Sequence, residues 1–362
     1  MSEYIFIDRA DEAEALAREW AGAAQLAVDT EFVRESTYRA QLCLMQISDG
    51  ERAACIDMLA LESPGPFAPL LTDPAVRKVF HSARQDIEVL YEHLGAIPGP
   101  IWDTQIAAAM LGYPDQVGYT QLTGAELGVT LPKDHARTDW SRRPLSDEQL
   151  RYAAADVMWL LPLATRLDEQ LETLGRRDWA AGECAALLDP TLYAFDAGGA
   201  WRRVKGANAL RGVALARLVA LAAWREEEAR RSDRPRRWIL KDEAVVALAE
   251  RGHTGGEALE VLPPAVARRH GDALLALLAA AGEHEAPSRP VYERMEPAQE
   301  RRARKLMAVL RELAEKHRVS TPLLATRKEV EALVKGERDL PLLRGWRREL
   351  AGDRLLALVD AD

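Results

Sequence analysis

The sequence predicts an α/β domain with a mixed sheet, followed by all-α helical domains. Up to about residue 83, short apolar runs rich in Val, Ile and Phe alternate with stretches of helical periodicity. From about residue 165 onward the strand pattern fades, and helices rich in Ala, Leu, Arg and Glu dominate. Two glycine- or proline-containing segments, 191–201 and 285–290, divide this helical part. We therefore expect domains at residues 1–190, 205–285 and 294–362.

Ten segments of the first domain have a clear local pattern. Those with the composition of β-strands are 4–8, 26–32, 42–48, 54–58 and 78–82. Those with the composition of helices are 11–21, 84–94, 103–112, 119–127 and 147–174. Strands in close succession, with helices between and after them, indicate a mixed sheet covered by helices.

The composition narrows the class of protein. The chain has 362 residues with 48% hydrophobic side chains, which is ample for sizeable cores. Its three cysteines have no CxxC spacing, which argues against a disulfide framework or a zinc knuckle. The first 20 residues are studded with charges, and no apolar run approaches the roughly 18 residues of a membrane span. These features predict a cytoplasmic protein with no membrane partner.

Charge is distributed unevenly along the chain. The formal net charge is −9, but residues 1–165 carry 13 Lys and Arg against 25 Asp and Glu. Residues 202–241 carry 12 basic side chains against 4 acidic ones. An acidic first part suits a site that concentrates metal ions, whereas a basic segment behind it suits a polyanion. A solvated helix surface is the alternative explanation of the basic segment.

Three separate segments carry acidic side chains whose spacing directs them to common faces. Asp29 and Glu31 are two residues apart in an apolar strand and therefore project from the same side of it. Tyr152 precedes Asp156 by one helical turn, and Asp86 lies early in another helix. Taken singly, these residues are explained by helix caps, turns or packed aromatics. Together they predict a site of oxygen ligands for hard divalent cations, which would offset the cost of burying carboxylates.

The order and spacing of these segments resemble the DEDD superfamily of 3′→5′ exonucleases. Its three motifs are represented here by VDTE (28–31), HSARQD (81–86) and YAAAD (152–156). Two further stretches, WDTQ (102–105) and TDWSRRPL (138–145), resemble the ribonuclease D family in particular. The resemblance implies an RNase H-like fold for the first domain.

The helical part resembles the HRDC domains (helicase and RNase D C-terminal) that accompany this family. Residues 224–249 look like the core of a first such domain, and 294–362 is placed as a second. The first contains basic side chains interleaved with an aromatic one, a composition that suits a grip on an RNA backbone. These residues are Arg230, Arg231, Arg234, Arg236, Arg237 and Trp238. A role in packing or protein contacts is the alternative.

The third motif assigns the chain to one branch of the superfamily. In the histidine branch a general base stands five residues before the last aspartate, where this chain has Arg151. Arginine stays protonated, so Tyr152, four residues before Asp156, indicates the tyrosine (DEDDy) branch. The resemblance then implies that two Mg²⁺ or Mn²⁺ ions about 4 Å apart clamp the scissile phosphate.

The resemblance also implies a role for each site residue. Asp29 bridges the two ions, Glu31 and Asp156 complete one coordination sphere, and Asp86 reaches the second ion. Tyr152 orients the attacking water or takes its proton. Because the ordinary pKa of tyrosine is near 10, it would need nearby cations to act as a base.

The function expected from this resemblance is 3′→5′ hydrolysis of RNA with release of nucleoside 5′-monophosphates. The expected substrates are tRNA precursors and other structured RNAs with single-stranded 3′ tails, and the enzyme is expected to act as a monomer. Two alternatives stay open: a DNA 3′→5′ exonuclease of the same superfamily, and a non-catalytic RNA-binding scaffold.

Five further residues are weaker candidates for contacts with substrate. Phe32 and Tyr38 could stack on terminal bases, although core packing explains Phe32 equally well. His81 could touch the substrate, with a satisfied structural histidine as the alternative. Arg142 and Arg143 could hold phosphates, with a helix-capping salt bridge as the alternative.

Overall fold

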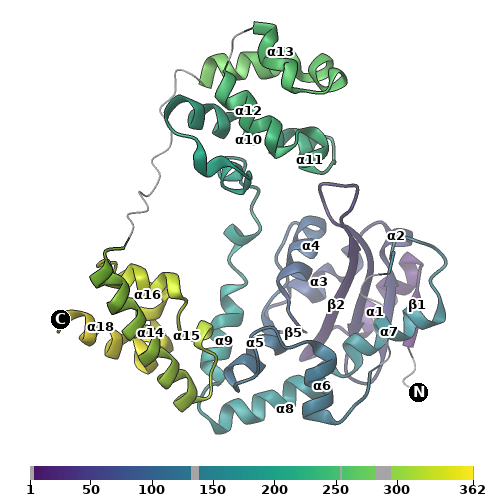
Figure 1. Ribbon diagram of the computed structural model, residues 1–362. Helices are drawn as coiled ribbons and strands as arrows, with labels where there is room; N and C mark the ends of the chain where they lie inside the picture. The colour runs from purple at the N-terminus through teal and green to yellow at the C-terminus, as the bar shows by residue number, and fades with distance from the viewer. Residues whose placement is uncertain (1–3, 132–137, 253–254, 282–294, 362) are drawn as a thin grey trace. The chain divides into compact units, whose positions relative to one another are not determined.

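The computed structural model describes residues 4–131, 138–252, 255–281 and 295–361. The chain divides into two compact units, each with segments that are distant in sequence (Figure 1). The first unit comprises Met1–Phe32, Leu42–Tyr193 and Glu293–Asp362, and the second comprises Val33–Gln41 and Ala194–Tyr292.

This grouping differs from the predicted domains in two places. Residues 294–362 were expected to form a separate domain, but they share one unit with the α/β domain. Residues 33–41 belong to the second unit, although the strands on either side of them belong to the first. The predicted boundary within 191–201 coincides with the change of unit after Tyr193, whereas the linker 285–290 lies outside the described residues.

A six-stranded mixed sheet forms the centre of the first unit, in the order β1-β4-β3-β2-β5-β6. The strands are β1 (Tyr4–Ile7), β2 (Gln25–Val33), β3 (Gln41–Ser48), β4 (Ala53–Asp57), β5 (Arg77–Phe80) and β6 (Ile101–Asp103). β3 and β4 run antiparallel, whereas the pairs β1–β4, β2–β5 and β5–β6 are parallel. The predicted fold class, a mixed α/β sheet followed by helices, is confirmed.

β6 was not predicted, because its residues 101–103 are too few to show a period-2 pattern. It exists through its pairing with β5, in which Ile101 lies opposite Lys78 and Trp102 opposite Val79. The expected helix 103–112 accordingly begins one residue later, with Asp103 as its N-cap.

β2 is a central strand whose composition changes along its length. Leu26, Ala27 and Val28 are fully buried, because both faces of this end of the sheet are covered. From Asp29 onward three polar side chains follow in succession, and every residue of this end of the strand except Thr30 is partly accessible. The change places the acidic side chains where the strand leaves the core.

Nine α-helices of the α/β domain surround the sheet or extend from it in the described part of the chain (Figure 1). They are α1 (Ala10–Glu19), α2 (Met58–Leu61), α3 (Ala68–Thr72), α4 (Arg84–Leu94), α5 (Thr104–Met110), α6 (Tyr119–Leu127), α7 (Asp147–Met158), α8 (Leu160–Thr173) and α9 (Arg177–Ala186). The single helix predicted over 147–174 is therefore two helices, which meet at Trp159. Pro162 explains the break, because it cannot donate to the carbonyl of Met158 and its ring clashes with it.

The C-terminal helices pack directly on the α/β domain. They are α14 (Pro297–His317), α15 (Thr321–Leu324), α16 (Arg327–Val334), α17 (Gly345–Arg347) and α18 (Asp353–Asp360). The ring of Trp346 stacks on that of Trp179 with centroids 5.2 Å apart. The buried guanidinium of Arg176 donates to the carbonyls of Met110 at the end of α5 and His317 at the end of α14. It thereby links the α/β domain to the C-terminal helices.

Glu183 provides the ionic part of this interface, and its removal should destabilise the protein. Its carboxylate accepts from both terminal nitrogens of Arg347 and from the indole of Trp346. Burial raises the pKa of Glu183, but hydrogen bonds from Arg347 outweigh burial and hold it below the ordinary value. Glu183→Gln should therefore lower the free energy of unfolding by about 1–3 kcal/mol at pH 7.

The sign of the pH dependence follows from the lowered pKa. The ionised Glu183 carboxylate stabilises the folded state at every pH above the pKa that it has in the unfolded chain. This stabilisation is lost as the pH falls through the lower pKa that it has in the folded protein. Urea denaturation at pH 7 and pH 3 should therefore show a smaller difference between variant and parent at pH 3. The control is Glu300→Gln, which removes an exposed partner of Arg304 and should cost under about 1 kcal/mol.

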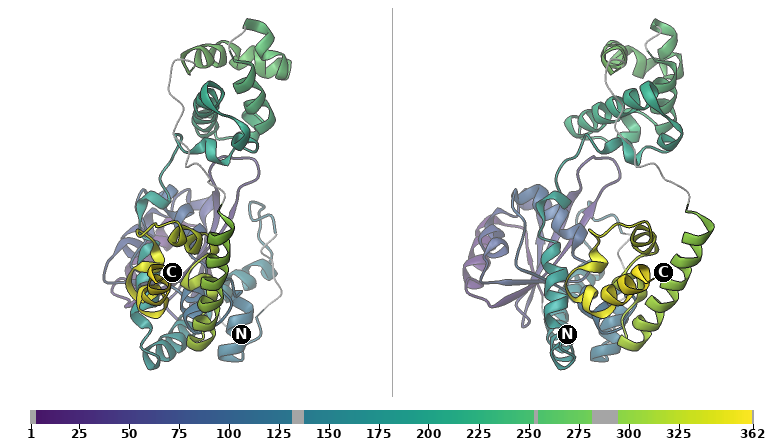
Figure 2. Two further views of the ribbon diagram at one scale, coloured as in Figure 1. Left: turned by 60° about the vertical axis from the view of Figure 1, so that its left-hand side comes forward. Right: turned by 90° about the vertical axis from the view of Figure 1, so that its left-hand side faces the viewer.

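The second unit is all-helical around its own core. Its α-helices in the described residues are α10 (Gly212–Arg231), α11 (Arg236–Ile239), α12 (Asp242–Arg251) and α13 (Pro264–Ala281), visible in three orientations in Figures 1 and 2. Leu218, Leu221 and Leu248 are fully buried at its centre. The segment 33–41 joins this unit through a hydrogen bond from the Tyr38 hydroxyl to the Glu226 carboxylate.

Among the described residues, no helix combines the length and the apolar character needed to cross a bilayer.

Candidate active site

A pocket of about 400 Å³ opens in the α/β domain at the polar end of β2. All five residues of the predicted catalytic set line it, so the structure brings together three segments that are far apart in sequence. Its wall consists of Asp29, Thr30, Glu31, Phe32, His81, Ser82, Gln85, Asp86, Tyr119, Tyr152, Asp156 and Leu160.

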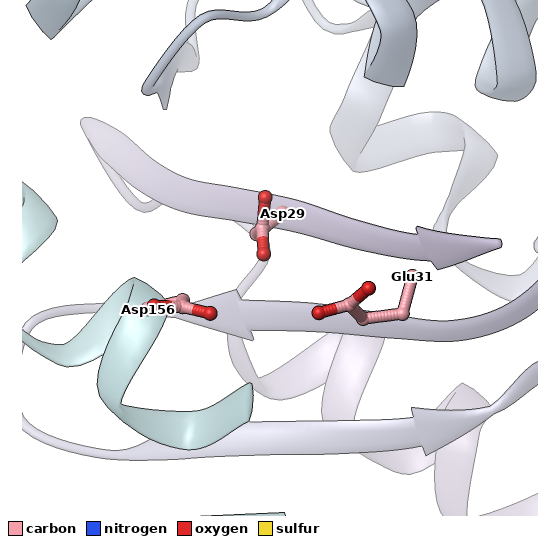
Figure 3. A group of neighbouring side chains, drawn as sticks. All are labelled: Asp29, Glu31 and Asp156. Atoms are coloured by element: carbon pink, nitrogen blue, oxygen red, sulfur yellow. The ribbon is translucent and has the colours of Figure 1, made fainter. Parts of the chain in front are cut away.

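Three carboxylates gather in this pocket (Figure 3). Asp29 and Glu31 project from β2, and Asp156 projects from α7. One oxygen of each lies within 4.8 Å of those of the other two, and all three side chains are partly accessible. Carboxylate oxygens at this spacing are the ligands that hard divalent cations prefer.

The start of α7 is set by its own sequence. The hydroxyl of Ser146 accepts from the Gln149 backbone N–H, and the Gln149 side chain accepts from the Ser146 N–H. This capping box fixes the register from which Tyr152 and Asp156 follow on one face. The ring of buried Trp140 lies 6.1 Å from that of Tyr152 and packs beside it.

Asp86 reaches the pocket from α4 and is the most buried of the four carboxylates, with 7% of its surface exposed. The hydroxyl of buried Thr30 donates to its Oδ1 atom at 2.5 Å and ties α4 to β2. The turn before α4 contains Ser82 at φ 64°, a backbone conformation that needs support. Asp103 supplies this support, because its carboxylate accepts from the backbone N–H groups of Ser82 and Ala83.

The clustered carboxylates perturb one another. Burial raises the pKa of Asp29 to about 6. Burial and the charge of Asp29 together raise the pKa of Asp86 well above its ordinary value. A site in which carboxylates resist ionisation lacks positive charge, and divalent cations would supply it. The residues present thus fit the metal ions that the family resemblance implies.

Tyr152 is protonated in this environment. Burial raises the pKa of its hydroxyl far above the usual value, and the charges of Asp156, Glu31 and Asp29 raise it further. Without bound cations the hydroxyl therefore keeps its proton, and it can both donate and accept hydrogen bonds.

His81 lines the pocket with both ring nitrogens in use. Its Nε2 atom lies 2.9 Å from the carbonyl of Val117, and its Nδ1 atom lies 2.9 Å from the hydroxyl of Thr104. Burial lowers the pKa of this histidine, so the neutral ring donates from Nε2 and accepts at Nδ1. The arrangement favours the structural alternative considered for His81, in which the ring joins the turn after β5 to the segment before α6.

Two of the other weak candidates are held by protein contacts and are not among the residues that line the pocket. Tyr38 lies in the second unit, hydrogen-bonded to Glu226. All five N–H groups of Arg143 are directed at protein acceptors, two of them at the carboxylate of Asp57. Arg143 thereby fastens the segment before α7 to the sheet, and it has no N–H group left over for a phosphate.

The remaining two weak candidates are accessible. Phe32 is half-buried and lines the pocket beside the carboxylates, which is compatible with stacking on a base. Arg142 is exposed and paired with Asp139 at 3.1 Å, outside the pocket wall.

Three functional positions were missed by sequence reasoning. Thr30 and Tyr119 were not singled out, although both line the pocket. Asp103 holds the turn before α4, and it was noted only as part of a motif. Its place before a helical segment is the pattern of an N-cap and could have identified it. Nothing local distinguishes Thr30 or Tyr119.

Comparisons with known proteins agree with this site. The family model described as 3′-5′ exonuclease matches residues 4–172, and the HRDC domain model matches residues 214–278. These exonucleases use divalent metal ions, and the cluster of Asp29, Glu31 and Asp156 fits that requirement.

Relatives match over nearly the whole chain. Ribonuclease D of Acidiphilium cryptum is 38% identical, covering 98% of this chain and 93% of that protein. Ribonuclease D of Pseudomonas paraeruginosa is also 38% identical, covering 95% and 94%. The crystal structure of Escherichia coli RNase D matches with a TM-score of 0.88 at 32% identity, covering 99% of both chains. The chain therefore belongs to the ribonuclease D family and is a 3′→5′ exoribonuclease.

Proposed function

We propose that this enzyme removes nucleotides from the 3′ end of RNA with two bound Mg²⁺ or Mn²⁺ ions and releases nucleoside 5′-monophosphates. The observation that carries the proposal is the convergence of Asp29, Glu31 and Asp156 within 4.8 Å beside Tyr152. Asp29 would contact both ions, Glu31 and Asp156 would hold one, and Asp86 would hold the other. The ions would neutralise the charge that develops on the phosphate and activate water for attack on phosphorus.

The protein side chains prepare the site for this reaction. Tyr152 keeps its proton and orients the attacking water through its hydroxyl. Thr30 holds Asp86 against β2 and so limits the freedom of that carboxylate. Phe32, at the pocket wall, offers a face on which the terminal base stacks regardless of sequence.

A time course on a 5′-labelled RNA with a single-stranded 3′ tail tests the proposal. In Mg²⁺ we expect a ladder that shortens by one nucleotide at a time, and in EDTA we expect none. A 3′-phosphate at the terminus should block the reaction. An intact band with binding still detectable would instead support the scaffold alternative.

A comparison of ribose and deoxyribose substrates distinguishes an RNA exonuclease from a DNA exonuclease. RNA and DNA oligomers of one sequence should differ in rate, because contacts to the 2′-hydroxyl are available only in RNA. Equal rates would favour a general nuclease.

We further propose that the substrates are tRNA precursors and other structured RNAs with single-stranded 3′ tails. The similar Escherichia coli protein is described as an exoribonuclease involved in structured RNA processing, which supports this class. The enzyme would meet such RNAs in the cytoplasm and act as a monomer, since one chain contributes every residue of the catalytic set. Trimming of a tRNA precursor by protein of monomeric mass in sedimentation would bear out both points.

The pH dependence of the rate should reflect the ionisation of the carboxylates in the pocket. Because the raised pKa of Asp29 is about 6, protons compete increasingly with metal ions as pH falls below that value. At subsaturating Mg²⁺ we expect kcat/KM to fall about tenfold per pH unit below pH 6. At higher Mg²⁺ concentrations this acidic decline of the pH profile should move to lower pH. Rates measured from pH 5 to 8 at several Mg²⁺ concentrations check this, and an acid limb that ignores Mg²⁺ would contradict it.

A further inference from the structure

The α5–α6 segment (residues 111–118) runs between the C-terminal helices and the catalytic pocket. It begins after Met110, at the end of α5, and leads into Tyr119, the first residue of α6. Tyr119 lines the pocket, and the reaction proposed above gives it no role. The contacts along this segment determine how firmly that part of the pocket wall is held.

The C-terminal helices hold the first half of the α5–α6 segment. Gly112 has φ 99°, and a Cβ atom added to it would lie 2.8 Å from the carbonyl oxygen of Arg318, at the end of α14. Only glycine allows the two backbones to approach so closely. Three residues later, the carboxylate of Asp115 accepts a hydrogen bond from the hydroxyl of Ser320. That hydroxyl also caps α15 by accepting from the Leu323 N–H at 3.3 Å, so the segment is fixed to the junction of α14 and α15.

The second half of the segment is held by residues of the pocket. The carbonyl of buried Val117 accepts from Nε2 of His81 at 2.9 Å and from the side-chain amide of Gln105 at 3.0 Å. The centroid of the Tyr119 ring lies 5.5 Å from that of the His81 ring, and both residues belong to the pocket wall. A shift of the segment at Asp115 would therefore displace both rings.

Tyr119 lies close to the carboxylates of the predicted metal site. Its hydroxyl donates to the carbonyl of Ala155 on α7 at 3.4 Å, one residue before Asp156. Burial raises the pKa of this hydroxyl well above the ordinary value, and the charges of Asp156 and Asp29 raise it further. Because the hydroxyl is directed at α7 and the side chain is only partly buried, the ring is the part that a ligand in the pocket can contact.

We propose that the ring of Tyr119 contacts the 3′-terminal nucleotide of the RNA, and that the hydrogen bond between Ser320 and Asp115 positions this ring. The C-terminal helices would thereby determine how tightly the pocket holds the RNA end, with Asp115 and Ser320 acting through Tyr119. An aromatic ring suits this contact, because every base and sugar offers it an apolar face. The inference rests on the proposed function and adds a substrate contact and its support to it.

Steady-state rates on a short single-stranded RNA in Mg²⁺ test the substrate contact. Tyr119→Ala should raise KM about 5- to 50-fold, in line with the loss of one aromatic contact to a nucleotide. The kcat should change little, because a contact that is equally strong in the bound substrate and in the transition state affects KM alone. Tyr119→Phe should keep the parental KM, since the ring remains. A parental KM in Tyr119→Ala would overturn the proposal.

Variants of Asp115 test the positioning role. Asp115→Ala should raise KM about 2- to 10-fold, the range expected for one hydrogen bond. Asp115→Asn should stay near the parental KM, because its amide oxygen still accepts from Ser320. In the Tyr119→Ala background, Asp115→Ala should have no further effect on KM, because it acts through the missing ring. Effects that multiply fully in the double variant, or equal losses in the alanine and asparagine variants, would overturn the positioning role.

A control and a second variant guard against effects on folding. Asp339→Ala removes an exposed carboxylate that pairs with Arg344 between α16 and α17, and it should leave KM unchanged. If urea denaturation shows that Asp115→Ala is unfolded, Ser320→Asp replaces it. A carboxylate at residue 320 still caps α15 but cannot donate to Asp115, so KM should rise in the same way.

The same assay separates this inference from the proposed function. A parent protein that does not shorten RNA in Mg²⁺ would refute the proposed function itself. An active parent whose KM is matched by Tyr119→Ala would refute only the role of Tyr119.

Discussion

Replacement of Asp29 by asparagine is expected to lower kcat by about 10³- to 10⁴-fold in Mg²⁺. The residue belongs to the carboxylate cluster, and asparagine keeps the shape of its side chain while removing the charge that would hold a cation. Because the surroundings of this carboxylate disfavour its charge and raise its pKa, the fold should be as stable as before or slightly more so. Single-turnover rates on a 5′-labelled RNA, with circular dichroism to verify the fold, measure the effect.

The matched control for this variant is Glu14→Gln, which removes a carboxylate from the exposed side of α1. Its rate should equal that of the parent protein. RNA affinity in EDTA should change little in either variant. Retained turnover in Asp29→Asn would overturn the metal assignment, whereas a lost fold would leave Asp29→Ser as the second variant to measure.

Replacement of Tyr152 by phenylalanine is expected to lower kcat by about 10²-fold or more, with KM changed little. The substitution removes only the hydroxyl that orients water, while the ring still packs beside Trp140. The pH at which activity declines on the acid side should stay where it is, since that limb comes from the carboxylates.

Tyr113→Phe is the comparison for this experiment. The Tyr113 hydroxyl donates to Glu126 away from the pocket, so kcat should be preserved. A Tyr152→Phe enzyme that turns over at the parental rate would show that water is oriented by another group.

Much of the fold was predictable because its patterns are local. The apolar strands around Asp29 and the capped start of α7 follow from residues within a few positions of one another. The predictions were wrong where contacts between distant residues, or one single residue, determine the secondary structure. β6 exists only through pairing with β5, and Pro162 divides a stretch that is otherwise continuously helical.

The catalytic set was also predictable in part. The spacing of Asp29 to Glu31 and of Tyr152 to Asp156 places each pair on one face of its element. That the two pairs meet in one pocket with Asp86 depends on the order of the strands and on the packing of α4 and α7. The prediction that these residues meet in one pocket came from the resemblance of the motifs to a known family, because spacing along the chain gives no information about contacts between distant segments.

The amino-acid sequence was sufficient for the class of fold, the family and the identity of the catalytic carboxylates, since these depend on periodicity and on short motifs. Only the tertiary structure determined which polar side chains have hydrogen-bond or ion-pair partners within the protein. Arg143 is wholly engaged with the protein, whereas Arg237 and Trp238 face solvent. Hydrogen bonds and exposure are set by residues far away in the chain, as Arg143 and Asp57 illustrate, and no local pattern encodes such partners.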